Sequence, residues 1–258
     1  MSPDILCERE AGIATVTLFN PGRLNALNAA MWHKLAAVFS ELDANENLRC
    51  IIIAGDGAAF AAGGDLVEMH GLRGTAAGAL AYHDTVERAL SAIERCRHPV
   101  IARIAGPCVG GGLEIACACD LRIAGQSARF GAPINKIGFS MYPGELAGLL
   151  RLAGAAVVKE ILLEGRLLTA PDAYTKGLVT RVVADAALED EVSACANHIA
   201  AGAPLVARAH KHWIARLQQG NLPDRNELQA SFAILDSADY AEGFAAFREK
   251  RAPRFTGR

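Results

Sequence analysis

The chain has 258 residues, 52% hydrophobic and 21% charged, which is enough to bury a large core. Its formal net charge of -2 argues against a surface that binds nucleic acid or an anionic membrane. Seven cysteines lie scattered, mostly within apolar runs, as is typical of a reducing compartment rather than of a disulfide framework. The N-terminus lacks the apolar region of a signal peptide, and no apolar run approaches ~18 residues. We therefore expect a soluble, cytoplasmic protein.

Apolar periodicity predicts alternating strands and helices in the first part of the chain. Residues 5–19 predict a β-hairpin that turns near Ala11. Asp65 follows a loop of small residues and is expected to begin a helix as its N-cap, with Glu68 completing a capping box. The other elements expected here are strands at 50–55, 100–106, 121–125 and 128–131, and helices at 28–42 and 79–96.

After Pro143 the sequence becomes rich in helix-like segments that are broken by glycine and proline. The helices expected there cover 145–153, 156–164, 187–201, 204–219 and 224–236. Strand and helix alternation followed by a helical tail predicts an α/β core with an α-helical appendage. The expected parts are a core at residues 1–200 and a helical region at 201–258.

The segment AGPCVGGGLEIACACD (105–120) places three glycines between an apolar strand and a helix. Backbone N–H groups at a helix start are unpaired and attract anionic oxygen, so the amide of Gly111 is a candidate oxygen-binding group. Glu114, one turn later, would have its carboxylate within reach of that oxygen. The segment is neither the dinucleotide fingerprint G-x-G-x-x-G nor a P-loop, which needs Lys-Ser/Thr. One interpretation is a proton-carrying carboxylate beside an oxyanion; the alternative is tight helix packing beside a solvated glutamate.

A second glycine pair strengthens the catalytic interpretation. In FAAGGDL (60–66) two glycines again precede a helix and follow the strand at 50–54. Two such loops, at the ends of neighbouring strands, would direct two amides at one oxygen. Each donor of such an oxyanion hole contributes about 3 kcal/mol in the transition state.

These stretches, in this order and spacing, resemble the crotonase superfamily, the enoyl-CoA hydratase/isomerase family. The similarity also includes GRLNALN (22–28), ARFGAPINKIG (128–138) and EGFAAFREKRAPRF (242–255). The resemblance implies a spiral of ββα units with a C-terminal helical domain that builds homotrimers, often paired into hexamers. It also implies binding of an acyl-CoA thioester, without a metal or a redox cofactor.

The resemblance further assigns expected roles to individual residues. The amides of Gly64 and Gly111 would hold the thioester oxygen and stabilise an enolate, while Glu114 moves the proton. The residues that match acyl-CoA-binding positions are Arg23, Leu24, Ala62, Asp65, Leu66, Phe247 and Lys250. Of these, Phe247 and Lys250 are expected to reach CoA from the C-terminal helix, often across a subunit boundary.

The chain departs from the hydratase pattern at one position. Hydratases of the family use a second glutamate after F-G-x-P, where this chain has Ile134, and an isoleucine cannot activate water. Glu145, in YPGELAGLLRL, matches by position the acid of some isomerases that move a double bond from the 3- to the 2-position. An acid is also favourable there simply because it begins a helix, so that alternative stays open.

Other candidate sites have less support. His210 and His212 are two apart on a helix and point to different sides, which makes a zinc pair improbable. Cys117 and Cys119 lie in an apolar helix, and the sequence has no G-x-S-x-G nucleophile elbow. The sequence therefore predicts an enzyme that isomerises or hydrates an enoyl-CoA. The alternatives are decarboxylation, dehalogenation or thioester hydrolysis by the same family, or a CoA-binding oligomer without catalysis.

Overall fold

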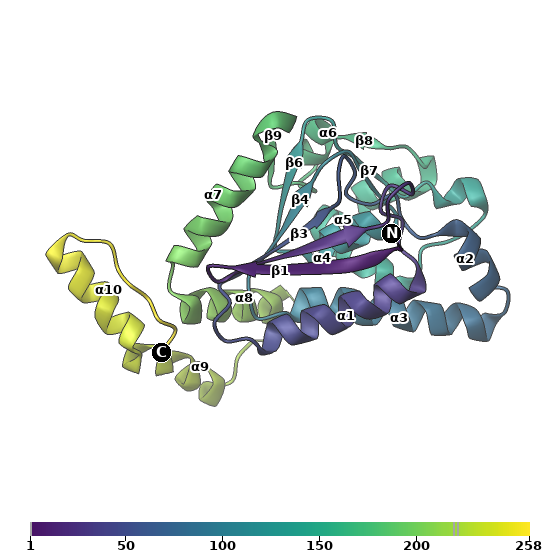
Figure 1. Ribbon diagram of the computed structural model, residues 1–258. Helices are drawn as coiled ribbons and strands as arrows, with labels where there is room; N and C mark the ends of the chain where they lie inside the picture. The colour runs from purple at the N-terminus through teal and green to yellow at the C-terminus, as the bar shows by residue number, and fades with distance from the viewer. Residues whose placement is uncertain (1, 219, 221) are drawn as a thin grey trace.

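Two β-sheets form the core of the protein (Figure 1), in a computed structural model that describes residues 2–218, 220 and 222–258. The larger sheet has the strand order β1-β2-β3-β4-β6-β9, and the smaller has the order β5-β7-β8. In the larger sheet β1 and β2 form the antiparallel hairpin that the sequence predicts, and the later neighbouring strands pair in parallel. The strands are β1 (Asp4–Glu10), β2 (Ile13–Phe19), β3 (Cys50–Gly55), β4 (Val100–Ile104), β5 (Pro107–Val109), β6 (Leu121–Gly125), β7 (Arg129–Gly131), β8 (Leu168–Thr169) and β9 (Arg181–Val183).

Consecutive strands alternate between the two sheets before the chain enters a helix. β4 of the larger sheet leads to β5 of the smaller one and then to α4, while β6 leads to β7 and then to α5. The chain takes the same course after β3, where Ala61 bridges to Cys108 of β5 before α2 begins. The helices are α1 (Ala29–Ala44), α2 (Leu66–Leu72), α3 (Ala76–Arg95), α4 (Gly111–Ala118), α5 (Pro143–Glu164), α6 (Ala170–Thr175), α7 (Leu188–Ala201), α8 (Pro204–Gln218), α9 (Arg225–Ser231) and α10 (Ala238–Glu249).

Strand β3 shows why the apolar runs are continuous. Because side chains alternate along a strand, Cys50 and Ile52 pack under α7, whereas Ile51 and Ile53 join the main core. Both faces of the strand are therefore buried, as expected of a parallel strand that helices cover on either side.

The elements differ from the sequence-based expectations mainly where they are very short. β5, β8 and β9 have two or three residues each, which is too short to show the alternation of apolar and polar residues that identifies a strand. The break expected between the helices at 145–153 and 156–164 is confirmed, since α5 consists of two helical segments that meet at a kink where Gly154 (φ 74°) is not helical. The last residue of the helix expected at 204–219 lies outside the described residues, and the one expected at 224–236 ends as a 3₁₀ turn over Phe232–Asp236.

Of the capping box expected at the start of α2, the Asp65 half is present and the Glu68 half is absent. The Asp65 carboxylate accepts hydrogen bonds from the N–H groups of Val67 (3.0 Å) and Glu68 (3.3 Å), as an N-cap does. The N–H of Asp65 already donates to the carbonyl of Leu27 at 2.8 Å, so it does not need Glu68. The Glu68 carboxylate instead accepts from the N–H of Ala29 at 2.7 Å and joins the starts of α1 and α2.

The C-terminal helical appendage begins with α8. Lys211 on α8 donates to Asp120 (2.7 Å) and to the carbonyl of His98 (3.0 Å), which fixes this helix to the core. Helices α9 and α10 extend away from the sheets (Figure 1). The chain then returns along α10, where Glu242 accepts from Arg251 at 2.6 Å. Within the described residues, no helix combines the length and the apolar character needed to cross a bilayer.

Candidate active site

The two glycine loops lie against each other at one edge of the larger sheet. They follow β3 and β4, which are neighbouring parallel strands, so both emerge at the same edge. Their backbones are hydrogen-bonded together: the N–H of Ala61 donates to the carbonyl of Pro107 (3.0 Å), and the N–H of Val109 donates to the carbonyl of Ala61 (2.9 Å). This ladder brings the glycines of the two loops together.

Glycine is required at several points of these loops. Gly63 (φ 105°) and Gly110 (φ 52°) adopt backbone conformations that other residues rarely tolerate. A Cβ atom on Gly64 would lie 2.3 Å from Met69 Sδ, and one on Gly111 would lie 2.8 Å from Trp32 Cζ2. At Gly111 the buried Trp32 ring leaves room only for a bare backbone, whereas at Gly64 the flexible Met69 side chain would have to move aside.

The amides of Gly64 and Gly111 are free to hold a ligand oxygen. Among the hydrogen bonds of the described residues, neither N–H group donates to a protein acceptor. Both glycines line the same pocket, and Gly111 is the first residue of α4, where the N–H groups point out of the helix. The structure thus supplies two unpaired donors next to one cavity, which is the arrangement that an oxyanion hole needs.

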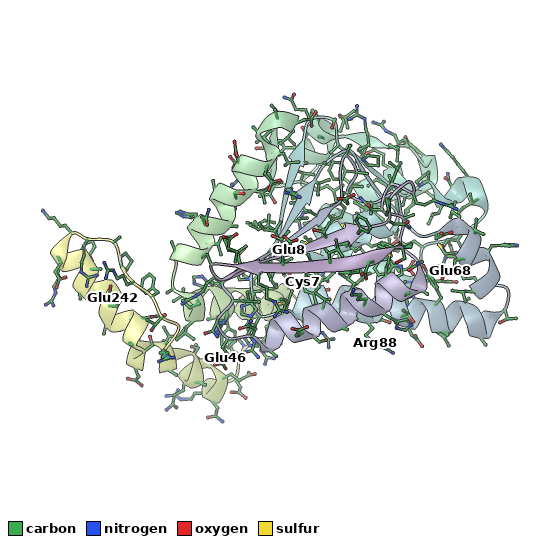
Figure 2. The ribbon with its side chains drawn as sticks, in the orientation of Figure 1. Cys7, Glu8, Glu46, Glu68, Arg88 and Glu242 are labelled. Carbon is green, nitrogen blue, oxygen red and sulfur yellow. The ribbon has the colours of Figure 1, made fainter. Side chains whose placement is uncertain are left out.

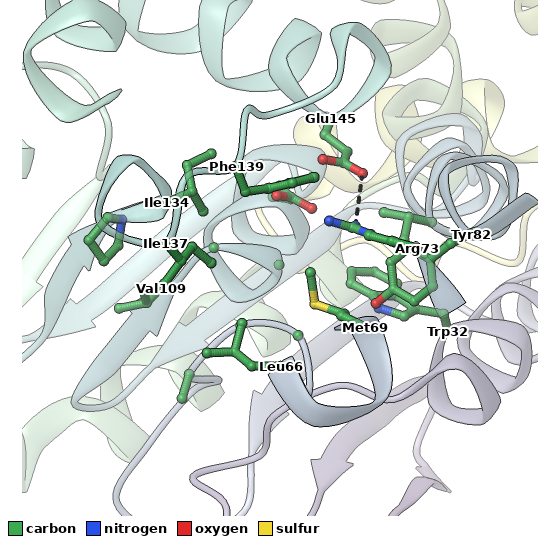
Figure 3. A pocket seen from close by; sticks show the side chains of 18 residues that line it. Trp32, Leu66, Met69, Arg73, Tyr82, Val109, Ile134, Ile137, Phe139 and Glu145 are labelled. Carbon is green, nitrogen blue, oxygen red and sulfur yellow. Dashed lines mark ion pairs between the residues drawn. The ribbon is translucent and has the colours of Figure 1, made fainter. Parts of the chain in front are cut away.

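The pocket beside these amides contains about 760 Å³ of empty space, part of which is open to solvent (Figure 3). One part of its wall is apolar and comes from Leu66, Met69, Val109, Ile134, Ile137 and Phe139. The charged residues that line it are Arg73, Glu114 and Glu145, which come from the ends of α2, α4 and α5. Carboxyl groups from two different helices therefore meet in one largely apolar cavity.

Glu114 is buried in the first turn of α4, a helix whose residues are all buried. Burial, together with the nearby Glu145 carboxylate, raises the pKa of Glu114 to about 8, although the Arg73 guanidinium opposes the shift. A carboxyl group of this kind holds its proton near neutral pH and can exchange it with a bound molecule. The solvated glutamate that the sequence left open is therefore wrong.

Glu145 is the third residue of α5 and is 4% exposed. Its Oε2 accepts a hydrogen bond from the N–H of Tyr142 at 3.3 Å, so this side chain does help to begin the helix. Its Oε1 lies 3.9 Å from Arg73 Nη2 and 3.6 Å from His83 Nδ1. Burial raises the pKa of Glu145, against the lowering effect of the Tyr142 amide and of Arg73. A side chain that only capped a helix would not need to line a pocket beside a guanidinium and an imidazole.

Sequence reasoning missed Arg73. Its guanidinium carbon lies 4.4 Å from the ring centroid of Tyr82 and 4.3 Å from that of Phe139, so two aromatic rings hold the charge beside Glu145 (Figure 3). Arg73 ends the short helix α2, where a basic residue is expected for the helix dipole alone. Nothing in the local sequence shows that this cation enters the pocket.

Several of the expected acyl-CoA contacts gather at the first glycine loop. Ala62 and Leu66 line the pocket, and the N–H of Ala62 donates to the carbonyl of Leu24 at 2.9 Å. Leu24 (φ 48°) is exposed, directly after the exposed Arg23. Asp65 belongs to the same loop, but its carboxylate is engaged in capping α2.

The structure does not bring Phe247 and Lys250 to this pocket within one chain. Both are at the end of α10, in the appendage that extends away from the sheets (Figure 1). Figure 2 shows Glu242 of this helix far from Glu68 of α2, the helix whose Leu66 and Met69 line the pocket. The Phe247 side chain is 83% exposed. Their expected contact with CoA across a subunit boundary stays a prediction.

Residues 8–258 match the family model described as enoyl-CoA hydratase/isomerase. The chain belongs to the enoyl-CoA hydratase/isomerase family. A crystal structure of an enoyl-CoA hydratase/carnithine racemase from Magnetospirillum magneticum is 50% identical, with a TM-score of 0.96 over 98% of this chain and 96% of that one. The "Probable enoyl-CoA hydratase echA8" of Mycobacterium bovis is 38% identical over 98% of both chains. The short-chain-enoyl-CoA hydratase of Clostridium acetobutylicum is 32% identical over 96% of this chain and 95% of that one.

Family membership confirms the fold class that the sequence predicts. The alternating strands, the ββα course and the helical C-terminal region are those of a crotonase-type fold. The chain is thus an enzyme of the enoyl-CoA hydratase/isomerase family. The departure at Ile134 lies in the pocket itself, since this side chain lines the cavity together with both glutamates.

Proposed function

We propose that the protein acts on an acyl-CoA thioester through an enolate. The amides of Gly64 and Gly111 hold the thioester oxygen, and Glu114 and Glu145 move protons to and from the acyl carbons. The observation that carries this proposal is that two unpaired amides and two buried carboxyl groups line one pocket. The names of the relatives, which are enoyl-CoA hydratases, support an acyl-CoA as the substrate.

The chemistry follows from the charge that the reaction develops. Removing a proton next to a thioester places negative charge on its oxygen, and two preorganised N–H donors stabilise that charge. Each donor contributes about 3 kcal/mol to the transition state. Holding the acyl carbon near a carboxylate makes the proton transfer effectively intramolecular. The proposed steps use neither a metal nor a redox cofactor.

Movement of a double bond between the 3- and the 2-position fits the side chains best. This reaction needs a base that takes a proton from one carbon and an acid that protonates another, and the two glutamates approach the cavity from different helices. Ile134 supports the proposal because a hydratase of the two-glutamate type needs an acid there to activate water. Hydration is the second candidate, because Glu145 still gives Glu114 a carboxyl partner in the pocket.

The test is turnover of a 3-enoyl-CoA by the purified protein, followed by the absorbance of the conjugated 2-enoyl thioester. We expect the absorbance to rise with the wild type and with Glu94→Gln, an exposed-surface control whose carboxylate pairs with Arg151. We expect the rise to be lost with Glu114→Gln and with Glu145→Gln. Equal, normal turnover by these two variants would refute the mechanism.

The same preparation separates the remaining candidates. Hydration would appear as a loss of the conjugated absorbance when a 2-enoyl-CoA is supplied. A CoA-binding oligomer without catalysis would bind acyl-CoA tightly but exchange no α-protons in deuterated buffer.

We also propose that the appendage, with its exposed Phe244 and Phe247, joins protomers into a trimer or a dimer of trimers. Light scattering of the purified protein tests that state.

A further inference from the structure

Two buried atoms without hydrogen-bond partners face each other behind the pocket. These are Glu145 Oε1 and His83 Nδ1, which are 3.6 Å apart. An unpaired buried polar atom costs free energy, and here one atom is an acceptor while the other can accept or donate a proton. A small shift of either side chain would close this distance to that of a hydrogen bond.

The second nitrogen of the same ring points toward the surface. His83 Nε2 lies 3.5 Å from Oε2 of Glu87, one turn later on α3, and the Glu87 side chain is 57% exposed. The imidazole thus stands between a buried carboxylate that lines the pocket and a carboxylate in contact with solvent. Histidine is suited to this position because each ring nitrogen can gain or lose a proton near neutral pH.

Gly144 makes this arrangement possible. It immediately precedes Glu145, and a Cβ atom on it would lie 2.9 Å from His83 Cε1 and 3.3 Å from Glu87 Cδ. Tyr142 packs against the opposite side of the site, with its ring centroid 5.0 Å from that of His83 at an angle of 70°. The start of α5 therefore both presents Glu145 and holds the imidazole in line with it.

We propose that His83 and Glu87 form a proton relay between Glu145 and solvent. This inference rests on the proposed function, in which Glu145 carries a proton. Glu145 removes a proton from C2 of the 3-enoyl chain, next to the thioester; the electrons of that C–H bond form a C1–C2 double bond, and the C=O π electrons move onto the thioester oxygen. The proton then passes from Oε1 to Nδ1 of His83, whose Nε2 proton passes to Glu87 and on to water. A solvent proton that returns by the reverse steps is delivered to C4 of the dienolate, where the C3–C4 π electrons bind it. The oxygen electron pair re-forms the thioester C=O, and the C1–C2 π electrons become the new C2–C3 double bond.

The charges around Glu145 are compatible with this path. Arg73 and Glu114 face it from the pocket side, while His83 and Glu87 face it from α3. Arg73 cannot act as the exit, because a guanidinium keeps its proton and aromatic rings enclose it. His83 does not touch the pocket, so it acts through Glu145 as a positioning and proton-transferring residue.

The relay predicts a specific isotope result. Isomerisation of a 3-enoyl-CoA in deuterated water should give a 2-enoyl product that contains deuterium, because the proton on Glu145 exchanges before it returns. We expect His83→Gln and Glu87→Gln to lower the deuterium content per turnover several-fold, while turnover itself falls less. The control is Asp84→Asn, an exposed acid on the same helix, which should keep the wild-type deuterium content. Equal deuterium content in all four proteins overturns the relay, whereas absence of turnover by the wild type refutes the proposed function instead.

Discussion

Replacement of Glu114 by glutamine tests whether the fold disfavours the charge of this carboxyl group. In the native protein its pKa is about 8, against 4.5 for an ordinary glutamate, because burial and the Glu145 carboxylate oppose ionisation. Between these two values the native side chain keeps its proton, whereas the unfolded chain has lost it. Unfolding therefore releases a proton. The stability that this group contributes is complete below pH 4.5 and is lost as the pH rises to 8.

The size of the effect follows from the pKa difference. One pKa unit corresponds to about 1.4 kcal/mol, so at pH 7 the carboxyl group lowers the free energy of unfolding by about 3 kcal/mol relative to pH 4.5. Glutamine has nearly the same shape and cannot ionise. We therefore expect Glu114→Gln to unfold like the wild type near pH 4.5 and to be about 3 kcal/mol more stable at pH 7.

Urea unfolding between pH 5 and pH 8, at a fixed protomer concentration, measures this difference. Glu94→Gln is the matched control, since its side chain is 40% exposed and its free energy of unfolding should change little at any pH. Glu114→Gln should also lose turnover, so this variant gains stability and loses activity. Wild-type and variant stabilities that run parallel across this pH range would show that Glu114 is already ionised in the native protein, and the reasoning would then be wrong.

Three further changes have clear expected outcomes. Gly111→Ala adds a Cβ atom 2.8 Å from Trp32 Cζ2, and we expect kcat to fall by about 10²–10³-fold together with the melting temperature. Gly148→Ala, whose Cβ atom would meet only ordinary contacts, should leave both unchanged. His98 is 1% exposed, and burial lowers its pKa to about 4, so the stability due to the neutral ring is present above pH 6.5 and is lost as the pH falls toward 4. His98→Leu should remove this part of the acid sensitivity, about 3 kcal/mol in urea titrations at low pH. Arg73→Met removes the cation that lowers the pKa of both pocket glutamates, so the acid limb of the pH–rate profile should move to higher pH.

The main features of the site could be predicted because they depend on local backbone geometry and on the order of strands, glycines and helices along the chain. Glycines that precede a helix after each of two apolar strands imply two exposed helix starts, and parallel pairing of β3 and β4 brings those starts together. Glu114 follows from helical spacing, since it lies one turn after Gly111. These inferences need only local geometry and the rule that sequential parallel strands are neighbours.

The rest depends on contacts between elements that are distant in sequence. Arg73 and His83 show no local signal, because one resembles a basic residue at a helix end and the other a polar residue beside the buried face of α3. Their importance comes from α5, which carries Glu145 to within 3.9 Å of the first and 3.6 Å of the second. Likewise, Glu68 could not be assigned from its spacing alone, since the N–H of Asp65 was already bonded to Leu27.

Ile134 and Glu145 together indicate what the departure from the hydratase pattern changes. Both line the cavity that contains Glu114, so the pocket keeps a pair of carboxyl groups although the acid after F-G-x-P is absent. The second carboxyl group comes from the start of α5 instead of the 3₁₀ turn at 134–137, and it therefore enters the cavity from a different wall. At the start of α5 the Glu145 carboxylate lies 3.9 Å from Arg73 Nη2 and 3.6 Å from His83 Nδ1. This position supports the proposed movement of a double bond, because a carboxyl group with a second proton partner suits a reaction that transfers protons between carbons.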